Sequence, residues 1–324
     1  MSDIAASPKR QRTEEELTPT RSHIWKPFGD IVLQVESTQF RVSRDVLANQ
    51  SSVFADMFSV PQPPNEPTVE GCPVVILPGD SAKDWELLLD VLYEPFDDKE
   101  RRSFAEIAAM LRLGRKYGIS TAEANALRRI RFEYPSDCAQ WEERVGCDEL
   151  SKIEDYCGIA LDLLKLAYEF GINSCIPTVS LNCLAAYSPD EIFNGIERFG
   201  QSRINIPVEI QTQLAFGFMK IMQFQREAYP WLDNDEVIPC GSCKGETDCT
   251  ASRHALRRSL SWSGITNNGA CFLIDLWDPE WSEGFCDDCA EAGKMSFTAT
   301  RGKAWEALPT FFGLGKWEEL KDLE

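Results

Sequence analysis

The stretch DIVLQVESTQFRVSRDVLANQSSVFADMFSV, residues 30–60, changes its apolar spacing halfway along. Its first half alternates apolar residues with others, which is the period of a β-strand with one buried face. ESTQ interrupts the alternation and predicts a turn between two strands. The apolar residues that define this predicted hairpin are Ile31, Leu33 and Val35 in the first strand and Phe40 and Val42 in the second.

The second half of the stretch has apolar residues at steps of three, four and seven, which predicts one helix that buries one side. Ser43 stands where the N-cap of this helix belongs. Further on, the continuous run VVIL at residues 74–77 predicts a strand covered on both faces. Three more helices are predicted to begin near Asp80, near Phe104 and at Ser120, where an S-x-x-E capping box opens the last of them.

This order of elements resembles a BTB/POZ domain. The resemblance is carried by Asp30-Ile31-Val32, by FRVSRDVLANQSSVFADMF at residues 40–58 and by VLYEP at residues 91–95. Two positions depart from the family pattern, because Ser43 stands where a histidine is common and Pro95 takes the approximate place of a glycine. The resemblance implies an α+β fold, a small sheet flanked by helices, over residues 24–135.

Apolar stripes at helical spacing continue beyond residue 135. SPDE at residues 188–191 combines an N-cap serine, a proline at the first helical position and a capping-box glutamate. We expect an α-helical extension over residues 136–235, similar to the one that follows many BTB domains. A cysteine-rich region, poor in regular structure, is expected over residues 236–324, and a disordered tail over residues 1–23.

The chain's ending supplies a second resemblance. ALPTFFGLGKWEEL at residues 307–320, together with the preceding CGSC and CDDC pairs, is similar to the C-terminal region of fungal BTB proteins that lack kelch or zinc-finger modules.

Composition excludes several classes of protein. The 324 residues are 43% hydrophobic, enough for two or three folded units, and carry a net charge of −19, which disfavours binding to phosphate backbones or anionic membranes. The apolar runs are far shorter than the roughly 20 residues of a membrane span, and the N-terminus lacks the apolar core of a signal peptide. We therefore expect an intracellular protein, cytoplasmic or nuclear, that binds neither nucleic acid nor membrane.

The chain has twelve cysteines, of which six are isolated in the sequence. The isolated residues, predicted to be buried or incidental thiols, are Cys72, Cys138, Cys147, Cys157, Cys175 and Cys183. The other six crowd into residues 240–289 and include two C-x-x-C pairs. Each pair lets two sulfur atoms reach one tetrahedral Zn²⁺ at about 2.3 Å.

We therefore predict one structural zinc ion bound by both pairs, Cys240 with Cys243 and Cys286 with Cys289. The 42 residues between the pairs exceed the usual spacing, so alternatives stay open. Cys249 or Cys271 could complete the ligand set in place of one pair. The thiols could also remain free, or form disulfides or take part in redox chemistry.

The sequence favours a protein-contact function over catalysis. It has two histidines, His23 in the predicted tail and His254 in a basic stretch expected at the surface, and it lacks nucleophile-elbow, Walker and dinucleotide-binding motifs. We therefore expect a non-enzymatic adaptor or scaffold. The BTB resemblance implies self-association or recruitment of a cullin-type scaffold, as in a ubiquitin-ligase substrate adaptor. The alternative is a transcriptional or chromatin regulator that acts through protein contacts.

The segment before the hairpin bears on self-association. BTB domains that dimerise by strand exchange carry an apolar helix and strand ahead of the first core strand. TEEELTPTRS at residues 13–22 is too polar for either, so we expect no strand-exchanged homodimer.

Overall fold

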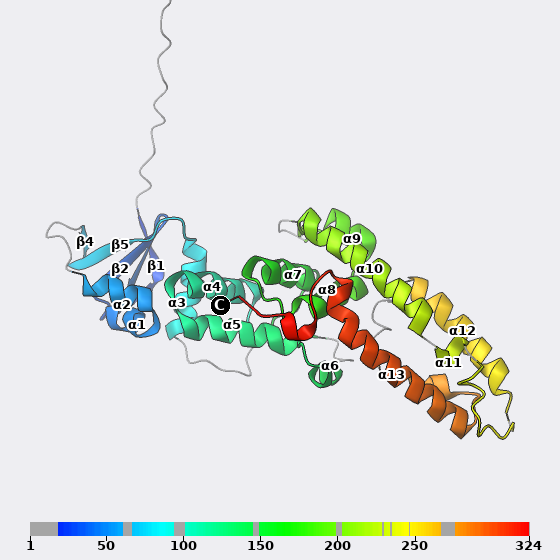
Figure 1. Ribbon diagram of the computed structural model, residues 1–324. Helices are drawn as coiled ribbons and strands as arrows, with labels where there is room; N and C mark the ends of the chain where they lie inside the picture. Colours follow the sequence, from blue (N-terminus) through cyan, green and yellow to red (C-terminus); the bar gives the residue numbers. More distant parts are fainter. Residues whose placement is uncertain are drawn as a thin grey trace, which may run out of the picture. The chain divides into compact units, whose positions relative to one another are not determined.

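The computed structural model describes residues 19–60, 67–93, 101–144, 149–198, 203–228, 230–233, 235–245, 247–266 and 276–323 (Figure 1). The chain divides into two compact units. The first comprises residues 1–96 and 109–123, and the second comprises residues 97–108 and 124–324. The second unit is helical throughout its described length apart from isolated bridges, and the first combines a sheet with helices.

The first unit is built on a five-stranded sheet with the order β1-β3-β2-β5-β4. The strands are β1 (Thr20–Trp25), β2 (Ile31–Val35), β3 (Thr38–Val42), β4 (Thr68–Val69) and β5 (Cys72–Ile76). The predicted hairpin is confirmed, because β2 and β3 pair antiparallel with Leu33 opposite Phe40. The chain reverses at Glu36, whose φ of 53° lies in the left-handed region.

Strand β1 begins within the residues that the sequence predicted to be tail, and its last two residues, Ile24 and Trp25, lie in the predicted domain. It pairs in parallel with β3, with Thr20 opposite Thr38. Within β1 the Ile24 side chain is buried, whereas Thr20 and Arg21 are exposed. One inward apolar residue and backbone pairing are enough for this edge strand, so the polar composition of the segment hid it. His23 is therefore a strand residue, and the prediction that it belongs to a tail is wrong; residues 1–18 lie outside the described part of the chain.

The strand that is covered on both faces is β2 and not β5. Val32 and Leu33, which point to opposite faces, are both 0% exposed, whereas Ile76 in β5 is 61% exposed. The position in the sheet explains the difference, because β2 is central and β5 is followed only by the two-residue β4. The continuous apolar run at residues 74–77 therefore misled the prediction about burial, although it found the strand.

Two helices replace the single helix predicted after the hairpin: α1 (Arg44–Gln50) and α2 (Ser52–Ser59). The break is at Ser51, which has an extended backbone. Its hydroxyl accepts a hydrogen bond from the Phe54 backbone N–H at 3.0 Å and so caps α2. Ser43 occupies the N-cap position of α1 but makes no side-chain capping bond.

The core of the first unit gathers around the Phe54 ring. Phe54 stacks on Tyr117 with ring centroids 5.1 Å apart and meets Trp85 edge-on at 5.8 Å. Trp85 belongs to α3 (Ala82–Tyr93), and Tyr117 ends α4 (Phe104–Tyr117). Helix α5 (Ser120–Glu133) follows with Ser120 as its first residue.

The second unit is a set of packed helices. These are α6 (Cys138–Arg144), α7 (Ile159–Phe170), α8 (Ile176–Ala186), α9 (Pro189–Asn194), α10 (Val208–Ala228), α11 (Pro230–Asp233), α12 (Cys249–Thr266) and α13 (Asp287–Phe311), with short 3₁₀ turns η2 (Pro279–Ser282) and η3 (Trp317–Glu319). Helix α7 packs on α8, and α13 packs on α10, α11 and α8. The capping box predicted at Ser188 and Glu191 is confirmed at the start of α9.

The cysteine-rich region is more regular than the sequence predicted. Helices α12 and α13, with 18 and 25 residues, fill most of its described length. The sequence indicated little regular structure because residues 240–260 lack a long apolar stripe, whereas α13 does bury one side, with Cys289, Phe297 and Leu308 among its buried residues. The stability of α12 and α13 comes from packing on α10 and α11 and from the cluster of aromatic and cysteine side chains between them.

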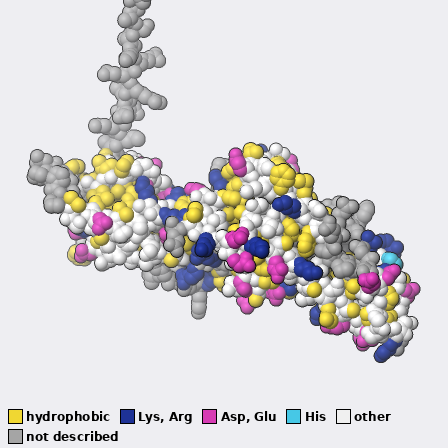
Figure 2. Space-filling model, viewed as in Figure 1, with side chains coloured by type: hydrophobic (Ala, Val, Ile, Leu, Met, Phe, Trp, Pro, Cys, Tyr) yellow, Lys and Arg dark blue, Asp and Glu magenta, His cyan; other side chains and the backbone are white. Residues whose placement is uncertain are grey.

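Exposed apolar side chains gather on the second unit, where Figure 2 shows a group of them over α9 and α10. The exposed members on these two helices are Phe193, Val208, Phe216, Phe218 and Met219. In the part of the chain that the structure describes, no helix is both long and apolar enough to cross a membrane.

Candidate metal centre

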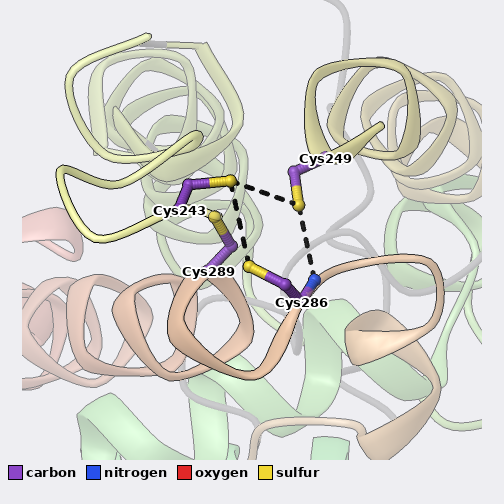
Figure 3. A group of neighbouring side chains, drawn as sticks. All are labelled: Cys243, Cys249, Cys286 and Cys289. Carbon is purple, nitrogen blue, oxygen red and sulfur yellow. Dashed lines mark hydrogen bonds between the residues drawn. The ribbon is translucent and has the colours of Figure 1, made fainter. Parts of the chain in front are cut away.

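The cysteines of the C-terminal region converge at the ends of two helices (Figure 3). Cys249 is the first residue of α12, Cys286 is the N-cap of α13 and Cys289 lies in the first turn of α13. Cys240 and Cys243 lie on one turn, in which the Cys243 N–H donates to the Cys240 carbonyl at 3.0 Å. Helix N-termini favour negative charge, so both helices favour thiolates at this point.

Four sulfur atoms form a compact group in which every pair lies within 4.8 Å. The group consists of Cys243, Cys249, Cys286 and Cys289. Cys243 is central, because its Sγ lies 3.9 Å from the Sγ atoms of both Cys249 and Cys286. A tetrahedral site with Zn–S bonds of about 2.3 Å needs sulfur atoms about 3.8 Å apart. The spacing and the all-thiol donor set therefore fit a tetrahedral thiophilic metal ion.

The structure brings all four sequence-predicted ligands into this neighbourhood and adds Cys249. Cys240 lies at its edge, with its Sγ 3.6 Å from that of Cys289 and 3.3 Å from the Ser242 hydroxyl. The spacing rule for C-x-x-C pairs misses Cys249, which stands alone in the sequence. Its signal is the helix start, where Asp248 accepts a hydrogen bond from the Ala251 N–H at 2.9 Å. Cys271, the other alternative, lies outside the described residues.

Backbone N–H groups point at two of the sulfur atoms. The Cys286 N–H donates to Cys249 Sγ at 3.3 Å, and the Cys240 N–H donates to Cys289 Sγ at 3.4 Å. Burial of Cys249 opposes its ionisation, but hydrogen bonds from the Thr247 side chain and the Cys286 N–H outweigh it and lower the pKa of Cys249 to about 7. Burial raises the pKa of Cys289. One buried thiol is thus close to ionisation at neutral pH before any metal binds.

An aromatic layer covers the cysteine group. Trp231, Trp277, Trp281 and Phe297 pack against one another and belong, with the cysteines, to one apolar cluster. Trp231 is 0% exposed and Cys289 is 0% exposed, so water is largely excluded from this side of the group. The arrangement is closed on that side, as in a structural metal site.

The isolated cysteines behave as predicted where the structure describes them. Cys72, Cys175 and Cys183 are buried, Cys138 is half-buried and Cys157 is exposed, while Cys147 lies outside the described residues. Burial raises the pKa of Cys175 to about 12, which keeps this thiol protonated and unreactive at neutral pH.

The histidines form no such constellation. The His23 ring nitrogens lie 3.1 Å from Glu86 and 3.2 Å from Asp90, and the His23 side chain is 62% exposed. His254 is exposed on α12, as predicted.

Comparison with known proteins identifies the sheet-containing part of the chain. No curated protein matches the sequence. The family model of the BTB/POZ domain matches residues 22–129, which contain most of β1, strands β2 to β5, helices α1 to α4 and most of α5. The chain therefore carries a BTB/POZ domain, a protein–protein interaction module, at residues 22–129.

Proposed function

We propose that this chain is a non-enzymatic adaptor whose BTB/POZ domain binds a protein partner. The observation that carries the proposal is the BTB/POZ match over residues 22–129. A cullin-type scaffold is the partner that we propose first, which would make the chain a ubiquitin-ligase substrate adaptor. The helical part would then hold the substrate or a second partner.

An apolar stripe on α2 supports a contact role for this domain. Val53 and Met57 lie four residues apart on α2 and so on one side of the helix, and Val60 follows the helix as its C-cap with an extended backbone. Val53 and Val60 are 38% and 60% exposed. Exposed apolar side chains on a helix and at its end are typical of an interaction surface, and a partner that covers them removes apolar area from water.

We also propose that the C-terminal cysteines bind one structural zinc ion. The ion would join the turn at residues 240–243 to the starts of α12 and α13, and so order the region that follows the helical extension. Four thiolates fill a tetrahedral shell and leave no position for water, so the proposed role is architectural.

Affinity purification of the tagged full-length chain, followed by mass spectrometry, tests the adaptor proposal. We expect enrichment of a cullin. The double variant Val53→Asp, Val60→Asp should lose it, because two carboxylates would be desolvated at the contact. The control makes the same kind of change on α10, Val208→Asp with Met219→Asp, and should keep it.

The outcomes separate the functional classes. Enrichment of the chain itself would indicate self-association, and enrichment of chromatin-associated factors without a cullin would favour the regulator hypothesis. A cullin that binds both variants equally would place the contact away from the α2 stripe.

A further inference from the structure

Five thiols surround a site that has room for four. We infer that the metal ligands are Cys243, Cys249, Cys286 and Cys289, and that the Cys240 thiol stays outside the coordination shell. The inference rests on the proposed zinc site and goes beyond it. It names the ligands, excludes one member of a C-x-x-C pair and chooses Cys249 from the alternatives that the sequence left open.

The sulfur geometry favours this set. The four named sulfur atoms share one sphere in which no pair is more than 4.8 Å apart. Two of the edges that meet at Cys243 are 3.9 Å, close to the edge of about 3.8 Å that a Zn(Cys)₄ tetrahedron requires. Among the described cysteines, the one whose Sγ lies within hydrogen-bonding distance of Cys240 Sγ is Cys289, at 3.6 Å, so Cys240 touches one corner of the tetrahedron.

The backbone shows how residue 240 contributes without its thiol. The N–H of Cys240 donates to Cys289 Sγ at 3.4 Å, as the N–H of Cys286 does to Cys249 Sγ at 3.3 Å. Such bonds stabilise the thiolate that accepts them. Residue 240 thus serves the site through its main chain, which a serine at this position keeps.

Charge gives an independent reason to expect an anionic group beside α12. Four thiolates with one divalent ion carry a net charge of −2. Arg253 is one helical turn beyond Cys249 and so lies on the same face of α12. Its side chain is 2% exposed, and its Nε and Nη1 have no hydrogen-bond partner among the residues that the structure describes.

A buried guanidinium needs compensating negative charge. Arg253 pairs through Nη2 with Asp235, but the Asp235 side chain is 81% exposed and interacts largely with water. A tetrathiolate metal centre on the same helix face would supply the missing negative charge inside the unit. Five neutral thiols would leave the charge of Arg253 without this compensation.

The experiment uses the full-length chain, purified without added metal or chelator, and compares Cys249→Ser with Cys240→Ser. Both variants make the same chemical change within one cluster. We measure bound zinc by elemental analysis, zinc affinity by competition with a chromophoric chelator, and the absorption spectrum after replacement by Co²⁺. Thiolate-to-cobalt charge-transfer intensity reports the number of sulfur ligands directly.

We expect one equivalent of zinc in the unchanged chain and in Cys240→Ser, with affinities within about tenfold of each other and equal charge-transfer intensity. Cys249→Ser should lose more than about a hundredfold in zinc affinity, beyond the range of outer-shell changes, and should lose charge-transfer intensity. Cys249→His, which restores a ligand atom, should recover zinc binding with a shifted cobalt spectrum. This third variant separates loss of a ligand from loss of folding.

Loss of zinc in Cys240→Ser with retention in Cys249→Ser would overturn the inferred ligand set, while zinc binding itself would stand. Equal charge-transfer intensity in the unchanged chain and Cys249→Ser would likewise exclude Cys249 as a ligand. An unchanged chain with far less than one equivalent of zinc, and no uptake on reconstitution, would overturn the zinc proposal as well. The adaptor proposal is independent of all these results.

Discussion

Among individual residues, Asp80 is a buried charge of the BTB/POZ domain that several side chains hold in place. Its buried carboxylate accepts hydrogen bonds from Trp85 Nε1 at 2.8 Å, from the Tyr117 hydroxyl and from Lys116. Burial opposes its ionisation, but these donors outweigh burial and hold the pKa of Asp80 below its usual value. The charged form therefore joins α4 to the start of α3, next to the Phe54 core.

We predict that Asp80→Asn destabilises the domain by about 1.5–3 kcal/mol at neutral pH, because hydrogen bonds to a charged acceptor are lost. A depressed pKa stabilises the fold above the unfolded-state value of about 3.9, and this contribution disappears as the pH falls through the folded-state pKa. The difference in free energy of unfolding between the unchanged chain and Asp80→Asn should therefore become smaller at acid pH. Urea unfolding of both full-length chains at neutral and at acid pH measures this difference. Hydrogen exchange in α3 reports the local effect.

The matched control for this prediction is Asp56→Asn on the exposed side of α2. A surface change of this kind should stay within about 0.5 kcal/mol of the unchanged chain. If the loss of stability caused by Asp80→Asn were the same at neutral and acid pH, the charge of the carboxylate would not be what stabilises the contact between α4 and the start of α3.

Among the helices and strands, the sequence predicted correctly those features that are set by residues close together in the chain. Alternation located β2 and β3, and the local signals at Ser188 and Glu191 located the start of α9. The break at Ser51 was missed because the Ser51 hydroxyl also donates to the Tyr117 carbonyl, a contact between residues far apart in sequence. Periodicity in a single stretch does not report such a contact.

Packing between α10 and the end of α13 depends on a glycine that the sequence does not mark. A β-carbon on Gly217 would lie 2.4 and 2.5 Å from two ring carbons of Phe312, and that ring is buried. Gly302, in contrast, is exposed on α13 with no atom within 4 Å of such a β-carbon. The two helical glycines therefore form a matched pair.

We predict that Gly217→Ala lowers stability by about 2 kcal/mol, because overpacking of up to about 3 kcal/mol exceeds the gain of about 1 kcal/mol in helix propensity. Gly302→Ala should raise stability by up to about 1 kcal/mol, since nothing opposes the propensity gain. Thermal and urea unfolding of both variants compare them. Equal effects at the two positions would mean that α10 and the Phe312 ring are not in contact.

For the tertiary structure, the sequence showed where the cysteines cluster but not which four sulfur atoms lie closest together. Both C-x-x-C pairs were visible because their spacing is local. Cys249 joins the group because α12 begins where the turn of Cys243 and the N-terminus of α13 meet, which is a property of the fold. A further domain-scale feature, β1, was missed for a related reason, since a polar edge strand is defined by the strand that it pairs with.

Strand β1 also decides how we expect the whole molecule to assemble. It pairs with β3 of its own chain, and Glu70 next to β4 binds both Trp25 Nε1, at 3.3 Å, and Arg21. Exchange of β1 between two copies of the chain would break these contacts within each chain and form the same contacts between the chains. It would bury no additional apolar area. We therefore predict a chain that does not form a strand-exchanged homodimer.

Light scattering of the full-length chain over a wide concentration range should give the monomer mass, and co-expressed chains with two different tags should not co-purify through β1. The diagnostic variant is Ile24→Asp, which places a charge at the single buried apolar anchor of this strand. In a monomer it should lower stability and leave the mass unchanged. A stable dimer that Ile24→Asp converts to monomer would instead mean that β1 bridges two copies, because only an exchanged strand couples its own docking to the association of the chains.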